Sequence, residues 1–327
     1  MEAYTDFAGV YDELMDDTPY EEWCAFLMEV FEKYGVDDIS KGDRPGRTDD
    51  GVIKSDADGG NEADREIGER AENLRQERNT ILDLGCGTGT LTELLARKGY
   101  DMIGVDNAQE MLQIAMEKRE RSGLPILYLL QDMRKFELYG TVGAVVSVCD
   151  SLNYLLEKED IVQTFRLVNN YLYPQGIFVF DFNTVYKYAT VIGDATIAEN
   201  REDCSFIWEN YYHEEQEINE YDLTVFVSED RMRQGMDVTR EEGMEHGADA
   251  MRKDGGETVQ GGRFRRFQEV HYQRGFCLEQ MKEFLAEAGL VFVEAQDADT
   301  HKKVRAESER IYVVARRGGE MKANQKV

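Results

Sequence analysis

Residues 81–90, Ile-Leu-Asp-Leu-Gly-Cys-Gly-Thr-Gly-Thr, decide the fold of this chain. The four residues before the first glycine predict a short buried parallel strand, and three alternate glycines follow at once. Leu91, Leu94 and Leu95 then recur at helical spacing, so we expect a helix to begin where the glycines end. A glycine turn between a strand and a helix lets backbone N–H groups approach a ligand closely, because no Cβ obstructs them.

The glycine spacing separates two classes of nucleotide-binding loop. A dinucleotide fingerprint has glycine at its first, third and sixth positions, and the sixth position counted from Gly85 is Thr90. A nicotinamide-dependent oxidoreductase is therefore disfavoured. The G-x-G-x-G spacing led by Asp83 resembles the loop of class I S-adenosylmethionine (SAM) methyltransferases, and the resemblance extends from about residue 81 to residue 317.

The charge balance bears on the substrate. The chain contains 66 acidic and 38 basic residues, which gives a formal net charge of -28. Phosphate binding needs a basic surface, so this excess argues against a nucleic-acid substrate. An equally good interpretation is that the acidic residues solvate surface loops.

The cysteines and the N-terminus bear on the compartment. Five cysteines, at positions 24, 86, 149, 204 and 277, are dispersed, with neither a C-x-x-C pair nor metal-ligand spacing. Such a set indicates free thiols in a reducing compartment and no metal site. Residues 1–17 lack a signal-peptide pattern, and no apolar run approaches transmembrane length. We therefore expect a cytoplasmic protein that does not bind a membrane.

Residues 1–39 are predicted to form a helical lid. Apolar residues recur at helical spacing from Trp23 to Tyr34, which predicts an amphipathic helix that can simply pack on the core. The resemblance implies a further role, because in small-molecule N-methyltransferases a tyrosine and a tryptophan of this segment close over SAM. Here they would be Tyr11 and Trp23. An aromatic face can stabilise the sulfonium cation by about 0.5–2 kcal/mol.

The end of the second predicted strand carries the next candidate. Asp106 follows Asp83 by 23 residues, close to the interval at which a strand-end acid meets a ribose hydroxyl pair. The alternative is that Asp106 only caps a helix, but Asn107 and Glu110 are predicted to form a capping box themselves. The resemblance implies that Asp132 and Met133, after the third strand, meet the adenine. The predicted cofactor-binding residues are Tyr11, Trp23, Gly85, Cys86, Gly87, Gly89, Asp106, Asn107, Met111, Asp132, Met133 and Cys149.

The fold class follows from the order of the patterns. Strand and helix patterns alternate up to residue 182, which predicts a doubly wound, mostly parallel α/β sheet. The resemblance implies seven strands with the last one antiparallel. Period-two runs at 204–212, 221–227 and 263–273 predict a small antiparallel sheet inserted after strand five. The expected units are a SAM-binding domain of residues 79–196 and 276–317, an inserted subdomain of residues 197–275 that covers the substrate, a disordered acidic insertion of residues 40–78, a mobile loop of residues 230–262 and a tail of residues 318–327.

Methyl transfer to an amine also needs a group that accepts a proton. The candidates are Asp150, just after the fourth strand, and His271, on the inserted sheet. Asp150 could instead hold a loop in shape, and His271 could lie in a strand face without proton work. In the family that the chain resembles, the nucleophilic cysteine of cytosine-C5 methyltransferases follows a proline, whereas Cys149 follows Val148. We therefore expect Cys149 to be a small residue of the cofactor wall and not a nucleophile. Asn153, Tyr211 and Tyr212 are the predicted substrate contacts.

The sequence therefore predicts a SAM-dependent methyltransferase that acts on a small molecule, most simply at an amine nitrogen. The turn at 149–153 and the inserted sheet ending at 270–274 resemble a bacterial branch that groups with amino-sugar N,N-dimethyltransferases and glycine or sarcosine N-methyltransferases. Two alternatives stay open. One is a methyltransferase that acts on protein or RNA, and the other is a non-catalytic SAM sensor.

Overall fold

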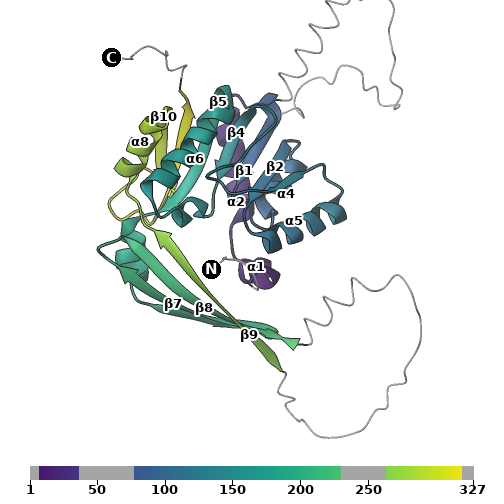
Figure 1. The fold of residues 1–327 in the computed structure, drawn as a ribbon, viewed down its shortest axis with the longest axis vertical. Coiled ribbons are helices and arrows are strands. Elements are labelled where there is room, and N and C mark those ends of the chain that lie inside the picture. Colours follow the sequence, from purple (N-terminus) through teal and green to yellow (C-terminus); the bar gives the residue numbers. More distant parts are fainter. Residues whose placement is uncertain (1–6, 37–76, 230–262, 319–327) are drawn as a thin grey trace, which may run out of the picture.

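The computed structural model describes residues 7–36, 77–229 and 263–318 (Figure 1). The predicted insertion of residues 40–78 falls outside the described residues except for its last two positions. The predicted loop of residues 230–262 and all but the first residue of the predicted tail also lie outside them.

A seven-stranded sheet forms the centre of the molecule (Figure 1). The strand order is β10-β11-β5-β4-β1-β2-β3, and β11 runs antiparallel to both of its neighbours while the other pairs are parallel. This confirms the predicted doubly wound, mostly parallel α/β fold. The strands are β1 Thr80–Leu84, β2 Asp101–Asp106, β3 Leu127–Leu130, β4 Val142–Ser147, β5 Leu172–Asn183, β10 Leu290–Asp297 and β11 Arg310–Arg317.

Helices cover both faces of this sheet. Ile177 and Val179 of β5 pack in one apolar cluster with residues of α2 and α4, while Phe178 and Phe180 pack in another with residues of α6 and α8. Burial on both faces explains why the central strands are apolar at successive positions. The helices are α2 Tyr20–Tyr34, α4 Thr90–Arg97, α5 Gln109–Ser122, α6 Lys158–Tyr171 and α8 Leu278–Glu287.

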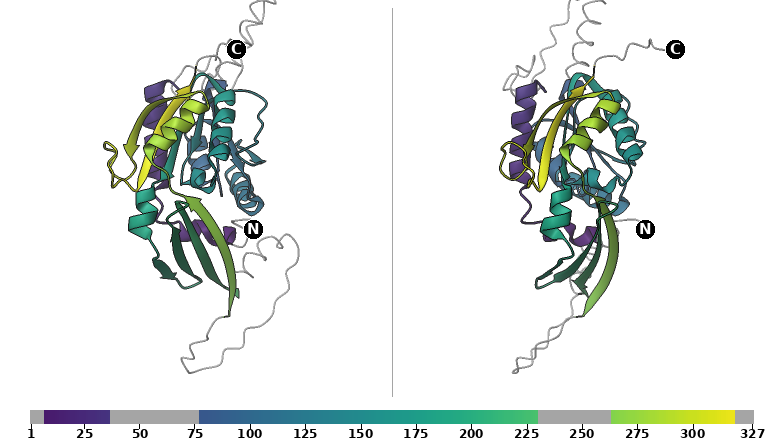
Figure 2. Two further views of the ribbon diagram at one scale, coloured as in Figure 1. Left: turned by 60° about the vertical axis from the view of Figure 1, so that its left-hand side comes forward. Right: turned by 90° about the vertical axis from the view of Figure 1, so that its left-hand side faces the viewer.

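A second, antiparallel sheet follows β5 and stands below the first in Figure 2. Its order is β6-β7-β8-β9, and the strands are β6 Thr196–Asn200, β7 Cys204–His213, β8 Ile218–Ser228 and β9 Phe264–Arg274. A π-helical turn, η3 Lys187–Ile192, connects it to β5. The sheet confirms the predicted insertion after strand five. Its edge strand β6 was not predicted, because four of its five residues are exposed and leave no apolar alternation to detect.

Helix α1, Ala8–Leu14, lies between the two sheets (Figure 1). Val10 packs with Leu223 and Val225 of the antiparallel sheet, and Ala8 packs with Ala108 and Met111 beside the larger one. The helix therefore contacts both halves of the molecule. Across residues 7–36, 77–229 and 263–318, no helix combines the length and the apolar character that a bilayer crossing requires.

Candidate functional site

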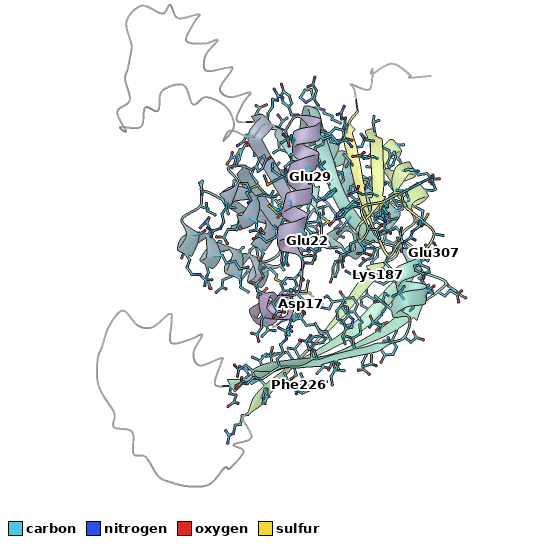
Figure 3. All side chains as sticks on the ribbon, turned by 180° about the vertical axis from the view of Figure 1, so that it is seen from behind. Asp17, Glu22, Glu29, Lys187, Phe226 and Glu307 are labelled. Carbon is cyan, nitrogen blue, oxygen red and sulfur yellow. The ribbon has the colours of Figure 1, made fainter. Side chains whose placement is uncertain are left out.

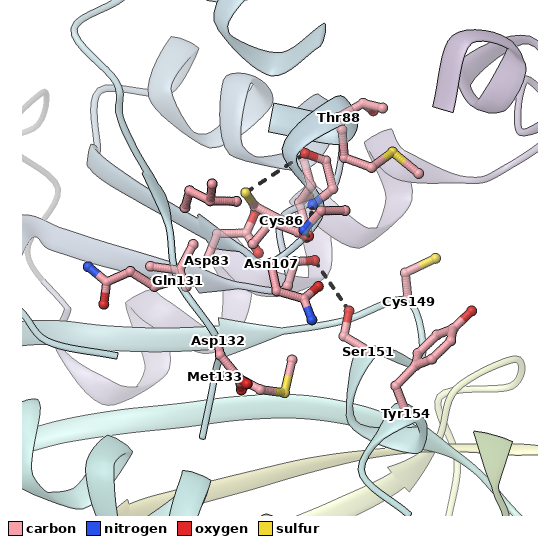
Figure 4. A pocket seen from close by; sticks show the side chains of 18 of the residues that line it. Asp83, Cys86, Thr88, Asn107, Gln131, Asp132, Met133, Cys149, Ser151 and Tyr154 are labelled. Carbon is pink, nitrogen blue, oxygen red and sulfur yellow. Dashed lines mark hydrogen bonds between the residues drawn. The ribbon is translucent and has the colours of Figure 1, made fainter. Parts of the chain in front are cut away.

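A cavity of about 520 Å³ opens beside the glycine loop at the carboxyl ends of β1, β2 and β4 (Figure 4). We call it the glycine-loop cavity. Every predicted cofactor-binding residue lines it except Trp23 and Gly89: they are Tyr11, Gly85, Cys86, Gly87, Asp106, Asn107, Met111, Asp132, Met133 and Cys149. The residues that local sequence patterns predicted therefore lie together, at the carboxyl ends of the strands, where ligands of open α/β sheets bind.

The three glycines of the loop have different neighbours. All three have positive φ, which a side chain would strain. A Cβ at Gly85 would lie 2.6 Å from Ser151 Oγ, whereas no atom lies within 4 Å of one at Gly87. A Cβ at Gly89 would lie 2.3 Å from Tyr128 Oη. Gly89 therefore permits the close packing of α4 on β3, and it lies outside the cavity.

Asp106 holds the loop from the end of β2. Its Oδ2 accepts a hydrogen bond from the Gly87 amide at 2.7 Å, and its Oδ1 accepts one from the Ala108 amide at 2.8 Å. The predicted capping box was wrong. The N-cap of α5 is Ala108 rather than Asn107, and an alanine side chain has no acceptor for the free amides of the first turn. A carboxylate has about four lone-pair sites, so Asp106 keeps capacity for a ligand in the cavity that it lines.

Asp83 lies buried at the end of β1, where it also lines the glycine-loop cavity. Burial, together with the nearby negative charge of Asp106, raises the pKa of the Asp83 carboxyl to about 7, although a hydrogen bond from Thr92 Oγ1 at 2.6 Å opposes the rise. The same burial raises the pKa of Asp106. Two carboxyl groups therefore stand in the cavity at a cost in solvation that a cationic ligand would relieve.

Asp132 and Met133 line the other end of the glycine-loop cavity (Figure 4). The guanidinium of Arg134 donates to Asp132, with Nη2 2.6 Å from Oδ2, and this bond lowers the pKa of the Asp132 carboxyl. Asp132 is thus a paired anion at the cavity wall. The sequence analysis missed Arg134, although a basic residue two positions after a strand-end acid is a pattern from which this pairing could have been predicted.

A polar cluster fastens α1 to the glycine loop. Asp12 accepts a hydrogen bond from Thr88 Oγ1 at 2.6 Å and forms an ion pair with Lys118 of α5 at 2.6 Å. Lys118 also donates to Thr90 Oγ1 at 2.8 Å. These contacts hold α1 so that Tyr11 forms part of the cavity wall.

A second cavity, of about 540 Å³, lies between the two sheets. We call it the inter-sheet cavity. Tyr11 and Cys149 line both cavities, so the two spaces meet at these side chains. Much of the remaining lining is aromatic and comes from α2 and the antiparallel sheet, and it includes Trp23, Phe206, Trp208, Tyr221 and His271. Asp17, Glu22 and Lys187 lie along its border (Figure 3).

The aromatic residues of the N-terminal segment divide between the two cavities. Trp23 lines the inter-sheet cavity, with the Arg310 guanidinium 5.7 Å from its ring centre. Tyr20 lines the glycine-loop cavity instead and meets Trp23 edge-on, with ring centroids 5.4 Å apart. The sequence analysis predicted Trp23 as the cofactor-binding residue and missed Tyr20, which lies less than one helical turn before it.

Cys149 and Asp150 form a turn with positive φ at both residues. Both of their backbone amides donate to the buried Asp181 carboxylate, at 3.1 and 2.8 Å. Arg310 binds Asp150 at 2.9 Å and Asp181 at 3.2 Å, and Gln273 donates to the other oxygen of Asp150 at 2.7 Å. Both oxygens of Asp150 are therefore occupied, and this network holds an unfavourable backbone conformation in place.

The same network bears on Cys149. Burial and the negative charge of Asp150 raise the pKa of the Cys149 thiol to about 12. A thiol with such a pKa is protonated at neutral pH and is a poor nucleophile. Its hydroxyl neighbour is Tyr11, with Oη 4.0 Å from Sγ.

His271 belongs to a buried cluster beside the junction of the two cavities. Its Nδ1 lies 3.1 Å from Tyr154 Oη, and its Nε2 lies 3.3 Å from Glu269 Oε2. The hydroxyls of Tyr154 and Tyr221 are 2.7 Å apart. Tyr154, in the short 3-10 helix η2 Ser151–Tyr154, lines the glycine-loop cavity, while Tyr221 and His271 line the inter-sheet cavity.

The three predicted substrate residues lie outside both cavities. Asn153 is buried, and its side chain bonds the backbone of Asn183 and Arg274, so it ties η2 to β5 and β9. Tyr211 is 48% exposed on β7. Tyr212 follows it near the end of the strand. Phe206 and Trp208 of the same strand line the inter-sheet cavity instead.

Comparisons with known proteins agree with this geometry. A family model described as a methyltransferase domain matches residues 81–176. YqeM of Bacillus subtilis, named as a methyltransferase, is 30% identical over 315 residues, which cover 96% of this chain and 97% of YqeM. A SAM-dependent methyltransferase from Clostridium acetobutylicum has the same fold, with a TM-score of 0.68 at 24% identity, over 97% of this chain and all of that one.

Shorter similarities reach enzymes with named acceptors. A dTDP-3-amino-3,4,6-trideoxy-alpha-D-glucopyranose N,N-dimethyltransferase of Streptomyces venezuelae is 32% identical over 115 residues, 35% of this chain and 46% of that enzyme. A ubiquinone biosynthesis O-methyltransferase of Photorhabdus laumondii is 31% identical over 83 residues, 25% of this chain and 35% of that enzyme. The whole-length similarity, the matching domain and the fold together show that this chain belongs to the SAM-dependent methyltransferases.

Proposed function

We propose that this enzyme transfers the methyl group of SAM to an amine nitrogen of a small molecule. One observation carries the proposal: two separate cavities meet at Tyr11 and Cys149. A cofactor in one and an acceptor in the other would bring their reacting groups together at that junction. SAM supplies an already activated methyl group, so the protein mainly positions the acceptor and excludes water.

The glycine-loop cavity is the proposed cofactor site. Asp106 would accept from the ribose hydroxyls, and Asp132 and Met133 would contact the adenine. Gly87 leaves open space where a side chain would stand, so the loop backbone can approach the methionine portion. The volume of about 520 Å³ lies in the range of sites for small organic ligands.

The inter-sheet cavity is the proposed acceptor site. Its volume of about 540 Å³ suits a small molecule rather than a polymer. Its lining includes five carboxyl groups (Asp17, Glu22, Asp150, Asp299 and Glu309) against two basic side chains (Lys187 and Arg310). This excess of negative charge attracts a cationic acceptor such as a protonated amine. The relative of Streptomyces venezuelae is named for an amino-sugar acceptor, which also supports an amine.

Methyl-tritiated SAM tests the proposal. The purified enzyme is incubated with dTDP-3-amino-3,4,6-trideoxyglucose, a panel of small primary and secondary amines, and a matched panel of phenols and catechols. We expect label in an amine product. Label confined to the hydroxyl panel would show an O-methyltransferase and contradict the proposal.

Cell extract added to the same assay examines the alternatives. Label that stays with protein or RNA would identify a macromolecular acceptor. SAM binding by calorimetry without label in any component would indicate a SAM sensor. A variant with Trp208→Ala serves as the matched control, because it changes the inter-sheet cavity only and should lower transfer while SAM affinity stays the same.

A further inference from the structure

Four polar side chains beside the junction of the two cavities form a continuous chain. Tyr221 and His271 are directly paired across β8 and β9, and their rings stack with centroids 4.9 Å apart. Glu269 lies two residues before His271 and therefore on the same face of β9. Tyr154 reaches the pair from η2, with its hydroxyl 2.7 Å from that of Tyr221 and 3.1 Å from His271 Nδ1.

The groups around these four side chains set the direction in which a proton would move along them. His271 and Glu269 are buried, at 2% and 6% exposure, and His271 Nε2 lies 3.3 Å from Glu269 Oε2. Glu269 also accepts a hydrogen bond from the Phe7 amide at 3.1 Å, as a carboxylate does. A carboxylate next to Nε2 favours the tautomer with its proton on that nitrogen, which leaves the Nδ1 lone pair for the Tyr154 hydroxyl.

We propose that Tyr221, Tyr154, His271 and Glu269 form a proton relay that deprotonates the methyl acceptor. This inference rests on the proposed function. The acceptor N–H donates to Tyr221 Oη, Tyr221 donates to Tyr154, and Tyr154 donates to His271 Nδ1. One proton leaves the acceptor nitrogen and one arrives on the imidazole, so both tyrosines end as neutral phenols. The Glu269 carboxylate then stabilises the imidazolium.

The other predicted base is less well placed. Asp150 lines the inter-sheet cavity, but its two oxygens accept hydrogen bonds from Arg310 and from Gln273. Taking up a proton there would remove a partner from a buried guanidinium, which carries a large energetic penalty. In the relay, by contrast, Tyr221 meets the acceptor, Tyr154 passes the proton on to His271, and Glu269 is a positioning residue that acts through His271.

Nitrogen-15 NMR tests the ground state of the relay in the SAM-free protein. The chain has four histidines, so the imidazole resonances can be assigned by substitution. We expect His271 to carry its proton on Nε2. Tyr154→Phe should shift the Nδ1 resonance, because the nitrogen loses its donor, and Glu269→Gln should weaken the preference for that tautomer. A His271 with its proton on Nδ1 would overturn the relay whatever the acceptor is.

Turnover tests the relay with the best acceptor of the amine panel. Because a positioned general base contributes about 10²–10⁴-fold, His271→Ala should lower kcat by that order, and added imidazole should restore part of it. Tyr221→Phe should lower kcat while SAM affinity by calorimetry stays the same, because Tyr221 lines only the inter-sheet cavity, and Tyr154→Phe should also lower kcat. Tyr212→Phe, on the same sheet but outside both cavities, is the matched control and should keep normal turnover.

The two arms separate the relay from the proposed function. If the wild-type enzyme labels no amine, the proposed function fails and the NMR result alone decides the relay. If it labels an amine, and His271→Ala, Tyr154→Phe and Tyr221→Phe all keep wild-type rates with an unchanged pH profile, the relay is refuted and the proposed function stands.

Discussion

The two cavities of this enzyme are built in different ways. The glycine-loop cavity is made by short segments that follow successive parallel strands, and Asp106 binds the amide of Gly87 in the loop and that of Ala108 after β2. The inter-sheet cavity is made by side chains from α1, α2, η3, the antiparallel sheet and β11. The comparison teaches that one site depends on a local backbone pattern, whereas the other depends on individual side chains brought together by the whole fold.

The largest effect is expected from the inter-sheet cavity. Arg310→Met leaves the carboxylates of Asp150 and Asp181 without their shared cation, and Asp181 is fully buried. Removing one partner of a buried ion pair typically costs about 3–5 kcal/mol of the free energy of unfolding. Urea denaturation measures this loss. Arg316→Met, at an exposed position of the same strand, is the control, and a loss no greater than the control's would show that the network is dispensable.

A smaller and pH-dependent effect is expected in the glycine-loop cavity. Because burial raises the Asp83 pKa from 3.8 to about 7, the folded state binds its proton more tightly than the unfolded state. The stability that this proton gives is full below the unfolded pKa and is lost as the pH rises towards 7, by about 1.4 kcal/mol per pH unit. Asp83→Asn removes this dependence. Ligand-free protein should therefore lose about 2 kcal/mol more than the variant between pH 5.5 and pH 7 in urea denaturation, and parallel curves would contradict the assignment.

The smallest effect is expected for the proposed ribose contact. Asp106→Asn removes the charge and replaces one acceptor oxygen by an NH2 donor that faces the amide of Gly87 or Ala108. The lost charge alone should weaken SAM binding by about 1.5 kcal/mol, or roughly tenfold. Isothermal calorimetry measures this. Glu110→Gln, a carboxyl group that lines the same cavity, is the matched control. Equal SAM affinities for both variants would remove Asp106 from the proposed cofactor site.

The same contrast explains what the sequence could predict. The strand, the glycine turn and Asp106 lie within 26 residues of one another, so their spacing along the chain was enough to predict that they line one cavity. The fold class followed for the same reason, because strands and helices alternate regularly. Even here the capping-box prediction was wrong, because α5 begins one residue later than the pattern indicated and its N-cap is Ala108 instead of Asn107.

The inter-sheet cavity was harder to predict. Arg310 and Asp181 are 129 residues apart, and nothing local to either residue pairs them. Tyr211 and Tyr212 were predicted to contact the substrate, and neither lines the inter-sheet cavity. Alternate residues of a strand share a face, so Tyr211 lies on the opposite face of β7 from Phe206 and Trp208. Tyr212 shares their face but lies nearer the other end of the strand.

Helix α1 has a thermodynamic consequence for the order of binding. Tyr11 is part of the wall of both cavities, and Asp12 binds the loop of one of them. A ligand that stabilises the docked helix from one side lowers the ordering cost for a ligand on the other side. By linkage the benefit is equal in both directions, so cofactor and acceptor should each tighten the binding of the other.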